Sequence, residues 1–260
     1  MRRLLTTLVL SILSLPAAAK MQSRAVEWSI GSQHFIGALV YDDSTAAKRP
    51  GLVMVPDWKG VTIPAIEQAK KVAGREYVIL VTDMYGKGVR PKDDTEAMAQ
   101  VSALYKDVPT MRARANKAVE VLKAQAASAP LDVSKIGAFG YCFGGSSVLE
   151  LARSGTKLAG IVTFHGGLET AQPATAGSIH TPLLVLNGAD DKGQKDNIVP
   201  FEQEMDRAGA DWTFVNFSGA VHCFALEAAN KPPGCMYNPR AAARAYKMMD
   251  GFFRERFATK

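Results

Sequence analysis

A strand that breaks into a sharp turn and then enters a helix constrains the fold of this chain most. The stretch Ile136–Gly145 is an apolar run followed by a cysteine in the frame Gly140-x-Cys142-x-Gly144. Small flanking residues permit a turn so tight that the central residue takes a strained backbone conformation. The turn exposes the thiol at a helix N-terminus, where backbone N–H groups favour a thiolate. The pattern is typical of a nucleophile elbow with cysteine in place of serine, but it also fits a buried structural cysteine.

Apolar runs alternate with helical patterns along the rest of the chain. Strands are expected at Ala25–Ile30, Phe35–Tyr41, Gly51–Val55, Tyr77–Thr82, Leu158–Phe164, Leu183–Leu186 and Trp212–Phe217. Helices are expected at Ile63–Gly74, Asp93–Lys106, Met111–Ala127, Phe143–Ser154, Phe201–Ala208 and Arg240–Phe257. The first two strands form an edge hairpin around a Gly-Ser turn. The sequence therefore predicts an α/β fold with a doubly wound, mostly parallel sheet and an antiparallel N-terminal hairpin.

The N-terminus differs in character from the rest of the chain. Two arginines precede the apolar stretch Leu4–Leu15, and Ala17–Ala19 follows it. This is the pattern of a signal peptide with an A-x-A cleavage site, and the apolar stretch is too short to span a membrane comfortably. We therefore expect residues 1–19 to be removed and residues 20–260 to form a single domain. The mature protein is expected to be periplasmic or secreted, without a membrane anchor.

Charge and cysteine content limit the expected partners. The chain carries a net charge of +6, and removing the two arginines leaves 6 − 2 = +4. Pairs such as Lys70-Lys71 are not interleaved with aromatic residues, so we expect a solvated helix face and no nucleic-acid partner. We also expect a monomer. An oxidising compartment would permit a disulfide between Cys223 and Cys235, the alternative being two free thiols, and Cys142 would remain unpaired.

A base and an acid for Cys142 are expected downstream, in the order nucleophile, acid, histidine. Of the four histidines, only His222 follows an acidic turn, in the loop after the last expected strand. We interpret His165, at the end of another strand, as a hydrogen-bonded structural histidine, the alternative being a pocket-lining residue. In the Gly-Ala-Asp-Asp turn that precedes His222, the usual Gly-x-x-Asp frame selects Asp191 as the acid. Asp190 is expected to shape the turn.

These residue types together predict acyl transfer. His222 would take the thiol proton, and Asp191 would orient the imidazole. Cys142 would then attack an ester or lactone carbonyl, forming an acyl-enzyme that water hydrolyses. The oxyanion would be held by the backbone N–H groups of Phe143 and of Trp58, which lies in the loop after the Gly51–Val55 strand.

The assembled motifs resemble those of the dienelactone hydrolase family. The shared segments span nearly all of the mature chain: Val55-Pro56-Asp57-Trp58-x-Gly60, Asp83-x-Tyr85-Gly86, Gly140–Gly145, Gly188–Asp191 and Gly219-Ala220-Val221-His222-x-Phe224. The resemblance implies an α/β-hydrolase fold, a Cys-His-Asp triad, no cofactor or metal, and small lactone or ester substrates. It also implies that an acid contacts the resting thiol. Asp57 stands at that position, where the dienelactone enzymes have a glutamate.

The expected substrate-binding residues depart from the family pattern. Family members that act on dienelactone hold its carboxylate with two arginines. Here Lys87, which follows the Tyr85 motif, replaces one arginine, and Leu226 replaces the other. Leucine cannot form the bidentate contact that a guanidinium makes with a carboxylate. We therefore expect Tyr85, Lys87 and Leu226 to bind a substrate with a more apolar acyl or alcohol group than dienelactone.

Three other functions remain open at this stage. The same triad would also serve a thioesterase or another acyl hydrolase. A catalytically inactive protein that binds small molecules could use the same fold. A thiol redox protein is disfavoured because the chain contains no C-x-x-C motif.

Overall fold

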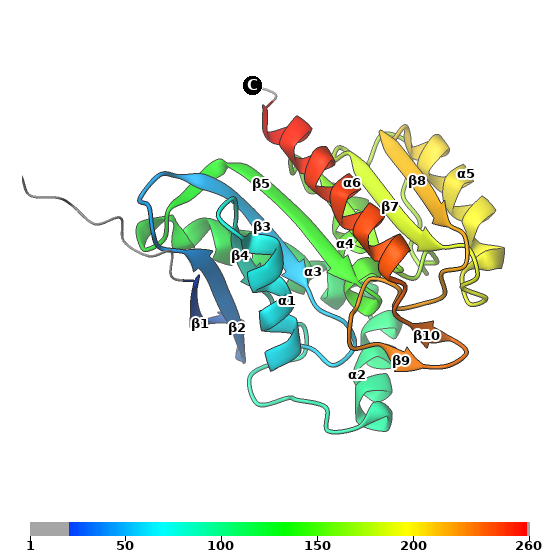
Figure 1. The fold of residues 1–260 in the computed structure, drawn as a ribbon, viewed down its shortest axis with the longest axis horizontal. Helices are drawn as coiled ribbons and strands as arrows, with labels where there is room; N and C mark the ends of the chain where they lie inside the picture. Colours follow the sequence, from blue (N-terminus) through cyan, green and yellow to red (C-terminus); the bar gives the residue numbers. More distant parts are fainter. Residues whose placement is uncertain (1–20, 259–260) are drawn as a thin grey trace, which may run out of the picture.

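The computed structural model describes residues 21–258, so the signal peptide expected over residues 1–19 lies outside the described residues. An eight-stranded sheet crosses the molecule (Figure 1). Its strands are β1 (Met21–Ile30), β2 (Gln33–Asp42), β3 (Arg49–Val55), β4 (Val78–Val81), β5 (Leu131–Tyr141), β6 (Ile161–Phe164), β7 (Leu183–Gly188) and β8 (Trp212–Phe217). The helices are α1 (Ile63–Ala73), α2 (Asp94–Lys106), α3 (Val108–Ala124), α4 (Phe143–Arg153), α5 (Ile198–Ala208) and α6 (Pro239–Ala258).

The strand order in the sheet is β1-β2-β4-β3-β5-β6-β7-β8. β1 pairs antiparallel with β2 in a regular register, from Met21 opposite Asp42 to Ile30 opposite Gln33, and β2 pairs antiparallel with β4. The remaining neighbours in the sheet are parallel. The predicted fold class is therefore confirmed, with the antiparallel hairpin at one edge of a mostly parallel sheet.

Helices cover both faces of this sheet. α1 and α6 lie on one face, and α3, α4 and α5 lie on the other (Figure 1). The short strands β4 and β6 are therefore buried along their whole length, as their mainly apolar sequences predict. Phe164 and Phe253 belong to the core on the α1/α6 side, and Val148 and Phe201 belong to the core on the opposite side.

Two helices begin three residues earlier than predicted, each for a local reason. α3 begins at Val108 because the Asp107 carboxylate caps it, accepting a hydrogen bond from the backbone N–H of Thr110 at 3.1 Å. α5 begins at Ile198 because Pro200 falls within its first turn, where a missing N–H costs no helical hydrogen bond. The sequence also gave no sign of a small ribbon formed by β9 (Asn230–Lys231) and β10 (Cys235–Met236).

The parallel strands bring three loops to one edge of the sheet. β5, β7 and β8 end there, and the loops that follow them carry Cys142, Asp191 and His222, respectively. This is the edge at which functional groups collect in open α/β sheets. Of the helices in the described part of the chain, none combines the length and the apolar character needed to cross a membrane.

Candidate active site

The turn between β5 and α4 has the strained geometry that its sequence predicts. Cys142 has φ 54° and ψ −120°, values that a residue with a side chain rarely adopts. A Cβ atom on Gly140 would lie 2.2 Å from the carbonyl oxygen of Gly144, and one on Gly144 would lie 2.0 Å from that of Val55. Neither position can carry a side chain. The backbone N–H of Cys142 donates to the carbonyl of Phe164 at 3.0 Å, which fixes the turn against β6.

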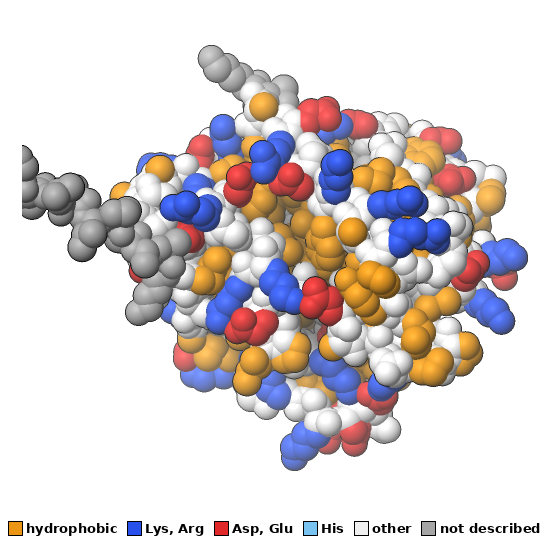
Figure 2. Space-filling model, in the orientation of Figure 1, with side chains coloured by type: hydrophobic (Ala, Val, Ile, Leu, Met, Phe, Trp, Pro, Cys, Tyr) orange, Lys and Arg blue, Asp and Glu red, His pale blue; other side chains and the backbone are white. Residues whose placement is uncertain are grey.

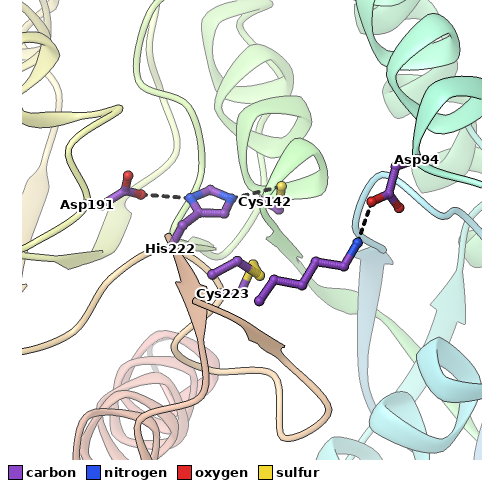
Figure 3. The surroundings of a disulfide bond; sticks show 7 residues. Asp94, Cys142, Asp191, His222 and Cys223 are labelled. Carbon is purple, nitrogen blue, oxygen red and sulfur yellow. Dashed lines mark hydrogen bonds and ion pairs between the residues drawn. A yellow bond between two sulfur atoms is a disulfide. The ribbon is translucent and has the colours of Figure 1, made fainter. Parts of the chain in front are cut away.

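Cys142, His222 and Asp191 form a continuous hydrogen-bonded array (Figure 3). His222 Nε2 lies 3.0 Å from Cys142 Sγ, and His222 Nδ1 lies 2.7 Å from Asp191 Oδ2. Asp191 is buried, with 7 % of its side chain exposed, whereas 26 % of the His222 side chain is exposed. The array has the order nucleophile, base and orienting acid that acyl-transfer chemistry requires.

Electrostatics favour the charged form of His222. Burial alone would lower the pKa of its imidazole, but the hydrogen bonds and negative charges of Asp191 and Cys142 outweigh burial and raise the pKa of His222 to about 10. Near neutral pH the imidazole therefore holds its proton. In that state it can stabilise a neighbouring thiolate and later protonate a leaving group.

Close backbone contacts fix the acid relative to the histidine loop. The Asp191 carboxylate accepts a hydrogen bond from the N–H of Gly193 at 3.1 Å, and the N–H of Asp190 donates to the carbonyl of Ala220 at 2.9 Å. A Cβ on Gly188 would lie 2.6 Å from that same Ala220 oxygen. The Gly-Ala-Asp-Asp turn thus packs directly against the loop that presents His222.

A disulfide holds the other side of the histidine loop. Cys223, which directly follows His222, is bonded to Cys235 (Figure 3). The N–H of Met236 also donates to the carbonyl of His222 at 3.1 Å. Cys142 is the free cysteine of this part of the chain. The disulfide therefore links His222 to β10 and closes the segment between residues 223 and 235.

Two backbone N–H groups beside the thiol are available to a ligand. The Tyr85 hydroxyl donates to the carbonyl oxygen of Trp58 at 2.9 Å, and the Tyr85 ring stacks on Phe143 with 5.7 Å between ring centroids. Among the contacts within residues 21–258, the N–H groups of Trp58 and Phe143 donate to no protein acceptor. Their role as an oxyanion hole stays a prediction. Tyr85 itself is buried and contacts both residues, and its expected role in substrate binding stays a prediction.

A pocket of about 450 Å³ opens between α1 and the segment closed by the disulfide. Its walls include Trp58, Ala65 and Leu226. Tyr141 and Cys223 also line it; they are the chain neighbours of Cys142 and His222, which are not themselves among its lining residues. The face drawn in Figure 2 shows hydrophobic side chains near its centre and a mixture of basic and acidic side chains around them. Leu226 therefore lines a pocket, and its role in substrate binding stays a prediction.

The expected contact between Asp57 and the resting thiol is not formed. The thiol faces His222, and within the described chain no hydrogen bond joins it to Asp57. The Asp57 carboxylate instead accepts a hydrogen bond from the N–H of Lys59 at 2.9 Å, which ties the short side chain to its own loop. Burial raises the pKa of Asp57, and the Lys59 N–H and the charges of Lys59 and His222 oppose that rise. Asp57 still lines the pocket.

The interpretation of Lys87 as a substrate ligand also needs correction. Its ammonium group forms an ion pair with Glu27 of β1 at 2.7 Å, and it is not among the pocket-lining residues. The cause lies in the backbone. Gly86 has φ 124°, and the N–H of Lys87 donates to the carbonyl of His34 at 2.7 Å. These contacts turn the chain toward the exposed edge hairpin.

His165 differs from its sequence interpretation as a hydrogen-bonded histidine. Its ring is fully buried, yet neither ring nitrogen has a hydrogen-bond partner. The ring packs against His222 with 5.1 Å between centroids. The sequence signal that could have identified it is its position at the end of β6, beside the strand that carries the elbow.

Comparisons with known proteins agree with this geometry. A family model described as the dienelactone hydrolase family matches residues 36–257. The solved structure of a protein named m3DLH is 35 % identical, with a TM-score of 0.84, over 91 % of this chain and 99 % of the other. P91, a dienelactone hydrolase-like promiscuous phosphotriesterase from metagenomic libraries, is 34 % identical, with a TM-score of 0.83 over the same shares. An uncharacterized protein of Caenorhabditis elegans is 30 % identical over 133 residues, which is 49 % of this chain and 84 % of that protein.

Proposed function

The chain belongs to the dienelactone hydrolase family, and on that premise we propose that it is an exported thiol hydrolase that works through Cys142, His222 and Asp191. Membership makes it an enzyme that hydrolyses carboxylic esters or lactones. The observation that supports the proposed triad is the continuous array from Asp191 through His222 to the Cys142 thiol. An inactive binding protein would have no need for a nucleophile, base and acid within hydrogen-bond distance of one another.

Acylation begins with the proton of Cys142 on His222. The thiolate sulfur attacks the carbonyl carbon, forming a C–S bond and moving the carbonyl electron pair onto oxygen. The N–H groups of Phe143 and Trp58 donate to that oxyanion. When the tetrahedral intermediate collapses, the C–O bond to the alcohol breaks, and His222 Nε2 transfers its proton to the leaving alkoxide. Asp191 holds the imidazole in the required tautomer throughout.

Deacylation reverses the proton transfers. His222, now neutral, takes a proton from water, and the resulting hydroxide attacks the thioester carbonyl. The C–S bond breaks, the carboxylic acid leaves, and the thiolate–imidazolium pair is restored. Because no group other than the triad and two backbone amides takes part, the cycle needs no redox partner.

The proposed substrate preference follows from the pocket whose walls include Tyr141 and Cys223, the chain neighbours of Cys142 and His222. Leu226 occupies the position at which family members that act on dienelactone carry an arginine, and Lys87 is paired with Glu27 outside the pocket. Neither of the two cationic positions expected to bind a substrate carboxylate is available in the pocket. The lysines that do line it, Lys59, Lys71 and Lys231, form ion pairs with Asp94 and Glu227. Esters or lactones with an apolar acyl or alcohol group should be better substrates than dienelactone itself.

Export remains part of the proposal. The N-terminal sequence supports it, and so does the disulfide beside His222, since structural disulfides persist in oxidising compartments. A direct measurement is the mass of the protein recovered from the periplasm or medium of an expressing bacterium. Loss of residues 1–19 is the expected result, and retention of the full chain in the cytoplasm would contradict it.

The triad is tested by hydrolysis of short p-nitrophenyl esters. Cys142→Ala should lower kcat/KM by about 10³-fold or more, because the acyl-enzyme cannot form. Ser147→Ala is the matched control, since this hydroxyl lies in the same helix turn but bonds to the carbonyl of Phe143 and not to the thiol. Its activity should stay within about twofold of wild type, as expected for a change outside the reacting groups. Equal activity of Cys142→Ala and wild type would exclude Cys142 as the nucleophile.

Phosphotriester hydrolysis is a second candidate activity. The observation that favours it is the 34 % identity to P91, which is described as a promiscuous phosphotriesterase. In that reaction the thiolate would attack phosphorus and release an alkoxide or phenolate. Diethyl p-nitrophenyl phosphate, used in the same assay, measures it. Release of p-nitrophenolate that disappears in Cys142→Ala would support this activity.

A further inference from the structure

His165 is an unusual buried histidine. None of its surface is exposed, and within residues 21–258 neither Nδ1 nor Nε2 has a hydrogen-bond partner. Its backbone is left-handed, with φ 41°, in a residue that carries a ring. Buried polar groups without partners and left-handed side-chain-bearing residues are both unfavourable, and both concentrate at functional sites. The proposed reaction leaves this residue without a role.

The segment after β6 fixes the His165 ring relative to the nucleophile. A Cβ on Gly166 would lie 2.4 Å from Thr163 Oγ1, and one on Gly145 would lie 2.8 Å from the Cα of Gly166. The N–H of Gly167 donates to Ser146 Oγ at 2.8 Å. The backbone on both sides of His165 is therefore packed against the first turn of α4, the helix that begins directly after Cys142.

The His165 ring, fixed in this way, packs against one side of the His222 imidazole. His165 and His222 meet edge to face, with 5.1 Å between centroids and 63° between ring planes. Phe224 meets His165 from another side, at 5.4 Å and 78°. His222 thus has Cys142 at one nitrogen, Asp191 at the other, and an aromatic ring against its body.

His165 is also held in its uncharged form. Burial lowers its pKa well below the usual 6.5, and the positive charge of His222 lowers it further. A contact between the ring and the residue's own backbone opposes this fall but does not meet the geometry of a hydrogen bond. The groups that face the pair from neighbouring elements are the Cys142 thiol, the Asp191 and Asp57 carboxylates, and the Tyr141 hydroxyl, which is bonded to Tyr246. The face of an uncharged aromatic ring attracts a cation that lies over it, whereas a protonated ring would repel that cation.

We propose that His165 is a positioning residue whose neutral ring holds His222 in line with Cys142 and Asp191 and favours the charged form of its imidazole. The inference rests on the proposed function only in taking the thiolate–imidazolium pair as the reactive state. It predicts that removing the ring weakens this pair even though His165 touches neither the thiol nor a substrate.

The test follows the rate at which iodoacetamide alkylates Cys142 as a function of pH. In His165→Asn the ring is lost, but asparagine tolerates a left-handed backbone better than most residues. The pH of half-maximal alkylation should rise by about one unit, which is about tenfold less thiolate at a pH below the midpoint. His165→Phe keeps an aromatic ring and should restore most of the shift. Phe217→Leu, a change in a ring that contacts Phe224 but not His165 or His222, should leave the midpoint unchanged.

Alkylation needs no substrate, so its result is independent of whether the esters are hydrolysed. A folded His165→Asn with the wild-type midpoint would overturn the proposal. If the variants do not fold, NMR of the wild-type protein with labelled histidines decides. The His165 resonances should show no titration between about pH 5 and 9, the range that spans the ordinary histidine pKa. A charged His165 at neutral pH would equally overturn the proposal.

Discussion

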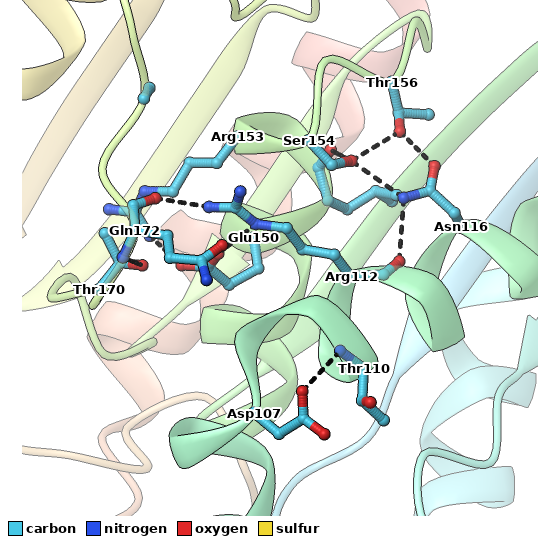
Figure 4. A network of polar contacts seen from close by, with 12 residues as sticks. Asp107, Thr110, Arg112, Asn116, Glu150, Arg153, Ser154, Thr156, Thr170 and Gln172 are labelled. Atoms are coloured by element: carbon cyan, nitrogen blue, oxygen red, sulfur yellow. Dashed lines mark hydrogen bonds and ion pairs between the residues drawn. The ribbon is translucent and has the colours of Figure 1, made fainter.

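Helix α4 has buried polar groups near both of its ends, and the two ends differ in whether these groups have hydrogen-bond partners. At its C-terminal end the buried Arg153 guanidinium contacts the Glu150 carboxylate at 2.9 Å and the Glu204 carboxylate at 2.9 and 2.8 Å. Arg112 of α3 adds a 2.8 Å contact to the second Glu150 oxygen (Figure 4). At the N-terminal end Cys142 has a strained backbone, and His165 leaves both ring nitrogens unpaired.

The contrast separates a structural cluster from a reactive one. A buried ion pair is tolerated when every charge has partners, and the Arg153 cluster joins α3, α4 and α5 in that way. The triad end keeps unpaired and strained groups, which are unfavourable for folding but leave atoms available for chemistry. Substitutions at the two ends should therefore affect different measurements.

The largest effect is expected at the reactive end, in Asp191→Asn. Without the carboxylate, the His222 tautomer and orientation are no longer fixed, so kcat should fall by roughly 10³- to 10⁴-fold. Asp190→Asn is the matched control, because the neighbouring carboxylate does not contact the histidine. The measurement is kcat for ester hydrolysis by both variants. Similar losses in the two variants would contradict the assignment of the acid.

At the structural end, Arg153→Met should act on stability and not on catalysis. It leaves Glu204 and one oxygen of Glu150 buried without their partner, which costs about 3–5 kcal/mol of unfolding free energy. The kcat per folded molecule should stay close to wild type. Urea denaturation measures the free energy of unfolding. Active-site titration counts the active molecules, so that kcat can be given per folded molecule. A strong loss of kcat in fully folded protein would show that the two ends are coupled.

The smallest effect comes from pH alone. His222 is charged below its pKa of about 10 and loses its proton above it, so the acid that protonates the leaving alkoxide disappears on the alkaline side. Above pH 10, kcat/KM should fall by about tenfold per pH unit. The raised pKa also stabilises the fold in full below about pH 6.5, and this contribution is lost as pH rises through 10. Circular dichroism at each pH separates titration from unfolding. A constant kcat/KM up to pH 11 would contradict the assignment.

The sequence was sufficient for the fold and for the spatial meeting of the triad. Strands buried on both faces leave a clear apolar signal, and parallel pairing then brings the loops with Cys142, Asp191 and His222 to one edge. The direction of Lys87 was not predictable, because it depends on the φ of Gly86 and on pairing with a distant strand. The sequence also could not predict that the ring nitrogens of His165 lack hydrogen-bond partners, because these partners would come from residues distant in the chain.

Three residues with side chains have a left-handed backbone in the described chain, and all three surround the site: Cys142, His165 and Cys223. Each such conformation costs roughly 1–3 kcal/mol, a cost that glycine at the same position would avoid. At Cys142 and His165, where no disulfide would be lost, glycine would relieve backbone strain and at the same time remove a group from the site. Glycine at either position should therefore make the protein more stable to heat and less active.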